Sequence, residues 1–208
     1  MRSGKEILLA SKEFTTENRM RSWLEILGTL LLFGLFFVGA VYPFPWLLRI
    51  VSSVSCGFIY VRMFVIYHDY QHRAILQNSV VANLLMKAIG IYLLAPETIW
   101  RRSHEHHHNN NSKLTITGIG SYPTVSKKRF LTLSKKERTI YLINRHPLTV
   151  IFGYFTLFIY WLNLKSFVQS PSKHLDSLFA LCFHGAAGSA VFFYLGAGSF
   201  LLGWFFPF

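Results

Sequence analysis

The chain has 208 residues, of which 52% are hydrophobic and only 14% are charged. This balance excludes an ordinary soluble domain, and apolar runs separated by charged stretches are typical of integral membrane proteins. The formal net charge of +12 lies mostly between the runs. Membrane topology explains that placement better than nucleic-acid binding, so we expect no nucleic-acid partner.

Two apolar runs open the chain, at residues 23–41 and 46–67, separated by the turn sequence YPFP. A helix needs about 20 residues to cross the hydrocarbon layer, so each run is long enough to span. The next apolar stretch, residues 80–95, is shorter and carries Lys87 in its middle. We therefore expect an interfacial or re-entrant helix there.

Charge bias supports the same topology. Five Lys or Arg residues lie in residues 1–22 and ten lie in residues 97–147. If residues 80–95 spanned the membrane, these two basic regions would face opposite sides, against the positive-inside rule. We therefore expect both regions on the cytoplasmic side. The short polar N-terminus has no transit-like stretch, which favours a bacterial inner membrane.

Further along the chain, the segment SKKE, Ser134 to Glu137, has the capping-box pattern and predicts a surface helix running toward Asn144. Apolar runs follow near residues 148–164 and 178–200. Together these patterns predict an all-α polytopic membrane protein. We expect a single domain over residues 1–208, with about four transmembrane helices in two hairpins and a cytoplasmic helical cap.

Six of the nine histidines form two clusters, HDYQH and HEHHH, both in the part assigned to the cytoplasm. On a helix, residues three or four apart share a face, whereas residues two apart do not. His106 therefore points away from the shared face of its cluster. The two facing sets are His68 and His72, and His104, His107 and His108.

Five imidazoles are more ligands than one tetrahedral zinc needs, so they indicate two metals, or one metal with positions filled from elsewhere. Asp69 is either a carboxylate that orients an imidazole or a solvated side chain. The alternative to a built metal site is a His/Asn tract that chelates metal only incidentally. We interpret His146 as an interface residue, and we expect His184 to hydrogen-bond a neighbouring helix. His174 is predicted to lie in the opposite loop, too far away to ligate.

The sequences HDYQHRA and WRRSHEHHHNN resemble the HDxxH and WRxxHxxHH boxes of the membrane fatty acid desaturase family. The resemblance implies two non-haem iron ions (Fe²⁺), with His68 and His72 as ligands from the first box and His104, His107 and His108 from the second. It also implies O2 as co-substrate, a fatty acyl or membrane-lipid substrate, and an electron donor of the ferredoxin or cytochrome b5 type.

The sequence departs from the family pattern at its C-terminal end. The family has a third HxxHH box, and no histidine follows His184 here. We therefore expect either a C-terminally truncated fragment or an inactive protein, and no turnover by these 208 residues alone.

Two other functions stay open. One is a histidine-box membrane hydroxylase or oxygenase acting on alkanes, carotenoids or lipids. The other is a non-catalytic metal-binding membrane protein such as a transporter, although the spans carry few ionisable residues. The motifs do not specify the position of the double bond, the acyl carrier, the electron donor or the oligomeric state.

Overall fold

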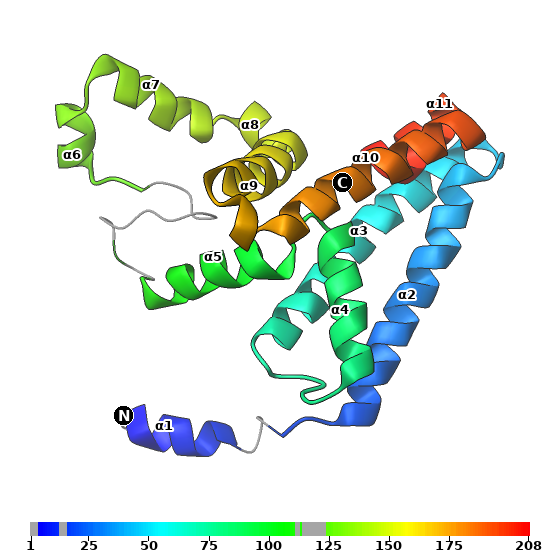
Figure 1. Cartoon of the computed structure of the whole chain (residues 1–208), viewed down its shortest axis with the longest axis horizontal. Helices are drawn as coiled ribbons and strands as arrows, with labels where there is room; N and C mark the ends of the chain where they lie inside the picture. Colours follow the sequence, from blue (N-terminus) through cyan, green and yellow to red (C-terminus); the bar gives the residue numbers. More distant parts are fainter. Residues whose placement is uncertain (1–3, 13–15, 111–112, 114–123) are drawn as a thin grey trace. The chain divides into compact units, whose positions relative to one another are not determined.

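The computed structural model describes residues 4–12, 16–110, 113 and 124–208, and its secondary structure there is entirely helical. This confirms the predicted all-α class. The chain forms two compact units, one of Met1–Ile89 with Ala190–Phe208 and one of Gly90–Ser189. The elements drawn in Figure 1 are α1 (Gly4–Ser11), α2 (Arg19–Val41), α3 (Trp46–Gln71), α4 (Val80–Tyr92), α5 (Glu97–Asn109), α6 (Lys127–Thr132), α7 (Lys135–Asn144), α8 (Pro147–Ile151), η2 (Tyr154–Leu164), α9 (Lys165–Gln169), η3 (Pro171–Lys173), α10 (Leu175–Leu195), α11 (Ala197–Phe200) and η4 (Leu201–Phe205).

Three single helices in the described residues are long and apolar enough to cross a membrane: α2, α3 and α10. Helices α2 and α3 contain the predicted spans 23–41 and 46–67, and α10 contains most of the predicted span 178–200. Helix α10 ends before residue 200 because Gly196, with a φ of +84°, interrupts it. The predicted span 148–164 is built from α8 and the π-helix η2, followed by α9. The pair α4 and α5 is bent by 85° and would provide a further span only if it crossed as one broken helix.

Helices α2 and α3 lie side by side as a hairpin (Figure 1). A Cβ atom at Gly39 would collide with the side chain of Ser52, so glycine lets the two helices approach closely. Arg62 of α3 binds the Glu25 carboxylate and donates its Nε–H to Thr29 Oγ1 at 2.8 Å. Pairing within the protein reduces the cost of charged groups in an apolar helix pair.

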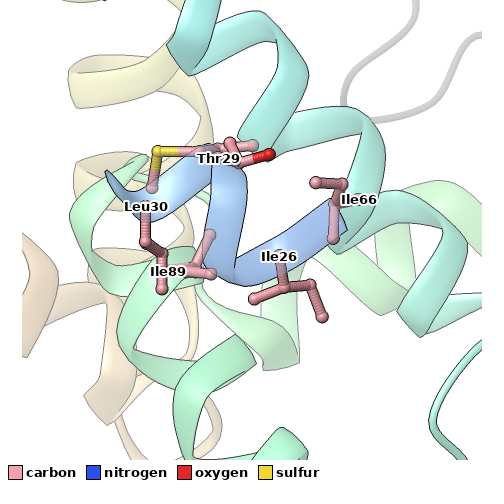
Figure 2. A pocket seen from close by; sticks show the side chains of 6 residues that line it. Ile26, Thr29, Leu30, Ile66 and Ile89 are labelled. Carbon is pink, nitrogen blue, oxygen red and sulfur yellow. The ribbon is translucent and has the colours of Figure 1, made fainter. Parts of the chain in front are cut away.

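A small apolar pocket lies beside this polar contact, lined by α2, α3 and α4 (Figure 2). Its lining residues are Ile26, Thr29, Leu30, Met63, Ile66 and Ile89. At the other end of the hairpin, Arg49 Nε donates to the carbonyl oxygen of Ala40 at 2.9 Å. Ala40 lies in the last turn of α2, whose carbonyl groups lack partners within the helix, so Arg49 caps it.

Candidate metal-binding histidines

The first histidine pair stands at the C-terminal end of α3. His68 lies in the last turn and His72 is the C-cap residue, so the two side chains share one face as their i,i+4 spacing predicts. Their Nε2 atoms are 3.2 Å apart, and their ring centroids are separated by 4.4 Å. Both side chains are reachable from solvent, His72 more than His68.

The contact with Asp69 favours one tautomer of His68. The Asp69 Oδ1 atom lies 3.3 Å from Nδ1 of His68, and a carboxylate can only accept a hydrogen bond from the imidazole. A proton held at Nδ1 leaves the lone pair of neutral His68 on Nε2, the atom that lies 3.2 Å from Nε2 of His72. Asp69 therefore contacts the imidazole in the way that an orienting carboxylate would.

The turn that follows this pair is strained. Arg73, Leu76 and Asn78 have φ values of 58°, 49° and 59°, in the left-handed region where non-glycine residues cost about 1 kcal/mol or more each. The N-terminal segment holds the turn in place. Glu17 accepts a hydrogen bond from the Leu76 amide at 2.7 Å, and Arg19 donates to the carbonyl oxygen of Gln77 at 2.9 Å. No local sequence pattern predicts these two contacts, because they join residues that are 59 and 58 positions apart.

The second histidine pair lies on α5. The Nε2 atoms of His104 and His108 are 3.1 Å apart, and their ring centroids are separated by 4.5 Å. The ring of His107 is exposed and lies beside them, 5.8 Å from the ring of His108. His106 does not share this contact; its Nδ1 atom faces the side-chain amide of Asn110 at 3.4 Å.

Trp100 packs directly against this pair. Its indole is stacked on the His104 imidazole with a centroid distance of 5.1 Å and an interplanar angle of 17°. The two residues are one helical turn apart, which is the spacing at which side chains on a helix meet. The stacking restricts the rotation of His104 about its own side-chain bonds. Sequence reasoning missed this role, although the i,i+4 spacing of Trp100 and His104 is readable.

Each pair fits a metal ion by its own geometry. Two imidazole nitrogens bound to one ion at about 2.0–2.1 Å lie about 3 Å apart when the angle at the ion is near 90°. The observed separations of 3.2 Å for His68–His72 and 3.1 Å for His104–His108 match that value. Neutral imidazole is a ligand for iron, zinc, copper and nickel, so the donors present fit a transition metal.

The break that precedes α5 is held by two polar side chains from the apolar helices. Asn163 of η2 is fully buried and donates to the carbonyl oxygen of Leu94 at 2.8 Å. His184 of α10 donates its Nε2–H to the carbonyl oxygen of Tyr92, and its Nδ1 accepts from Tyr154 at 3.3 Å. These two carbonyl groups lie at the end of α4 or just after it, where a helix no longer supplies backbone N–H donors. The prediction that His184 bonds a neighbouring helix is confirmed.

The first turn of α5 is held by Asp176, in the first turn of α10, and by His174 just before that helix. The backbone N–H of Thr98 donates to Asp176 Oδ2 at 3.0 Å, and its hydroxyl donates to Oδ1 at 2.6 Å. His174 Nδ1 lies 3.0 Å from the same hydroxyl oxygen and donates to it, because that hydroxyl proton is already given to Asp176. A carboxylate at a helix N-terminus both satisfies a free N–H and complements the helix dipole.

His174 lies in the loop between η3 and α10, and through Thr98 it contacts the helix that carries the second pair. It is buried, and burial lowers its pKa, although Asp176 opposes that shift. Thr98 is six residues before His104, or about 9 Å along the helix axis. His174 thus secures α5 at a distance from the paired imidazoles. His146 caps α8 by accepting from the Leu148 amide at 3.2 Å.

The chain is similar to known proteins over most of its length. The family described as fatty acid desaturase matches residues 44–208. A fatty acid desaturase of Bacillus subtilis (strain 168) is 24% identical over 136 residues, which cover 64% of this chain and 39% of the relative. An sn-1 oleoyl-lipid 12-desaturase of Anabaena variabilis is 28% identical over 103 residues, covering 50% of this chain and 29% of the relative.

The matched part of the chain thus spans well under half the length of these two relatives. No solved structure matches the chain significantly. The family match covers most of the sequence and includes both histidine clusters. The chain belongs to the fatty acid desaturase family.

Proposed function

We propose that this protein introduces a double bond into an acyl chain in an O2-dependent reaction, with two iron ions held by its histidines. The observation that carries the proposal is the repeated geometry of the two pairs, each with Nε2 atoms at the separation that two ligands of one ion require. The proposed ligands are His68, His72, His104, His107 and His108.

The side chains around the proposed ligands have separate tasks. Asp69 keeps the proton of His68 on Nδ1, so that Nε2 is available to the metal. Trp100 restricts His104 by stacking, and Asp176 with Thr98 fixes the start of the helix that carries it. The bound iron, with O2, would supply an oxidant strong enough for unactivated C–H bonds, which no side chain can provide.

The substrate and partners follow from the family and the apolar helices. The relative from Anabaena variabilis is named for action on an oleoyl lipid, so we propose an acyl lipid of the bilayer as substrate. The electron donor is a soluble or membrane protein of the ferredoxin or cytochrome b5 type. The histidine clusters and the N-terminus face the cytoplasm of a bacterial inner membrane, as the distribution of Lys and Arg favours.

Lipid analysis tests the activity. The protein is expressed from its own reading frame, through to the stop codon, in a host without polyunsaturated lipids. Its fatty acids are read by gas chromatography–mass spectrometry. New double bonds that disappear in His68→Ala and His107→Ala, but persist in the control His146→Ala, would support the proposal. Hydroxylated products would instead indicate the hydroxylase function.

Metal binding is tested separately, because the 208 residues contain no HxxHH sequence after His184. The purified chain is titrated with Fe²⁺ without oxygen. His72→Ala and His108→Ala should each lower the affinity at least tenfold, since each removes one of two paired ligands. Unchanged binding in both variants would refute the proposed ligand set. Iron binding without any lipid product would favour the non-catalytic metal-binding function.

A further inference from the structure

The helices α6 and α7 form a small basic hairpin, here called the basic hairpin (residues 124–146). It contains seven Lys or Arg residues and a single carboxylate, that of Glu137. The basic residues are Lys127, Lys128, Arg129, Lys135, Lys136, Arg138 and Arg145. A surface with this excess of positive charge attracts an anionic partner.

The basic hairpin has its own internal contacts, which make it a defined surface. Phe130 of α6 packs on Tyr141 of α7 with ring centroids 5.5 Å apart. Arg138 donates to the carbonyl oxygens of Leu131 at 2.5 Å and Leu133 at 3.1 Å, closing the turn between the helices. The predicted capping box is confirmed, because Ser134 and Glu137 exchange both of its hydrogen bonds. The lysines are therefore presented on an ordered support.

Four of the positive charges have no partner within the described residues. The ammonium groups of Lys127, Lys128, Lys135 and Lys136 are exposed, and no carboxylate of the described chain pairs with them. Glu137 is occupied by the Ser134 hydroxyl and amide, and these hydrogen bonds lower its pKa. The single nearby carboxylate thus serves the helix cap.

Charge and apolarity are separated along the axis of α7. Its first half carries Lys135 and Lys136, whereas its second half exposes Ile140, Leu142 and Ile143, each about half accessible or more. Only Arg145 and His146 separate α7 from Pro147, the first residue of α8, so the connection spans at most about 11 Å. The exposed apolar side chains therefore lead directly into the apolar run that we expect to enter the membrane.

We propose that the basic hairpin docks on the anionic phospholipid headgroups of the membrane that the chain's own apolar helices enter. The four lysines contact phosphate groups, and Ile140, Leu142 and Ile143 enter the boundary between headgroups and acyl chains. An acidic soluble protein would satisfy the charges, but it would not explain the exposed apolar residues that continue toward Leu148. The short connection to α8 keeps the hairpin at the surface, which favours a lipid occupant.

Lysine labelling tests this docking on the whole chain. The protein is reconstituted in nanodiscs of phosphatidylcholine alone or with phosphatidylglycerol, and it is treated with a water-soluble acetylating reagent. Mass spectrometry then gives the labelling rate of each lysine. We expect Lys127, Lys128, Lys135 and Lys136 to be labelled at least tenfold more slowly with phosphatidylglycerol, and this protection to be lost in 1 M salt. Lys173, an isolated exposed lysine, should change little.

A charge-matched pair of variants separates docking from net charge. Each lysine near an anionic surface should contribute about a fivefold factor to docking. Lys127→Gln with Lys128→Gln should therefore remove most of the protection at Lys135 and Lys136. The control, Lys5→Gln with Lys12→Gln, changes the charge equally outside the hairpin and should leave the protection intact.

Three results would overturn the proposal. The first is equal labelling in both lipid mixtures. The second is equal loss of protection in the two charge-matched variants. The third is protection of the four lysines by added poly-glutamate, with none from phosphatidylglycerol, which would assign the surface to an acidic protein.

Discussion

The hydroxyl of Thr98 donates to the carboxylate of Asp176 at 2.6 Å, joining the first turn of α5 to the first turn of α10. The two residues are 78 positions apart. Thr98 is also contacted by His174, at 3.0 Å, and Asn163 and His184 hold the break just before it. The helix that carries His104 and His108 therefore starts from a point fixed by three other segments of the same unit.

Loss of the Asp176 carboxylate should loosen that start. Asp176→Ala removes an N-terminal cap, an effect of about 1 kcal/mol, so the Thr98 amide should exchange with solvent about fivefold faster. Asp176→Asn keeps an acceptor and should show a smaller change. Hydrogen exchange with mass spectrometry measures both. Equal exchange in all three proteins would mean that the carboxylate does not hold α5.

The buried amide of Asn163 predicts a larger stability effect. Asn163→Leu keeps the branched side-chain shape but removes the donor to the carbonyl oxygens of Leu94 and Phe158. Leaving buried carbonyl groups unpaired costs about 1–3 kcal/mol, which should lower the unfolding midpoint by several degrees. Thermal unfolding in detergent measures it, with the partly exposed Asn144→Leu as a polar-to-apolar control. An unchanged midpoint would show that these carbonyl groups find other partners.

The burial of His174 predicts an acid-sensitive contact. Its folded-state pKa is lowered below the ordinary value of 6.5, so the folded state favours the neutral ring. The resulting stability is fully present above pH 6.5 and falls as the pH drops toward the folded-state pKa. His174→Gln keeps a donor for Thr98 but does not titrate. It should lose less stability than the unchanged protein between pH 7 and pH 5, as measured by thermal unfolding. An equal loss in both proteins would contradict this prediction.

The stacking of Trp100 on His104 predicts an effect on metal affinity. Trp100→Ala frees the imidazole to leave the orientation in which its Nε2 atom meets His108, so iron affinity should fall about tenfold. Trp100→Phe retains an aromatic face and should bind within about threefold of the unchanged protein. Anaerobic iron titration compares the three. A loss as large for Trp100→Phe as for Trp100→Ala would argue against ring stacking as the cause.

The parts of the structure that follow local rules were predictable. Hydrophobic run length identified α2, α3 and α10, and helical spacing paired His68 with His72 and His104 with His108. The capping box at Ser134 was equally readable. Each of these features depends on residues that are close together in the sequence.

The contacts that position the histidine helices were not predictable. Asp176, Asn163 and Glu17 act on residues between 59 and 78 positions away, and no periodicity encodes such pairings. Run lengths predict that His174 lies in the opposite loop, too far away to ligate, and do not indicate any contact with α5. The structure instead brings it to the start of α5.

The strained turn after α3 has a practical consequence for handling the protein. Its left-handed residues at positions 73, 76 and 78 are held in place by Glu17, just before α2, and by Arg19, the first residue of α2. A deletion or proteolytic cut that removes those two residues would free the turn and disturb the end of the helix that presents His68 and His72. An N-terminal truncation should therefore retain Glu17 and Arg19, and a tag should be attached before Glu17.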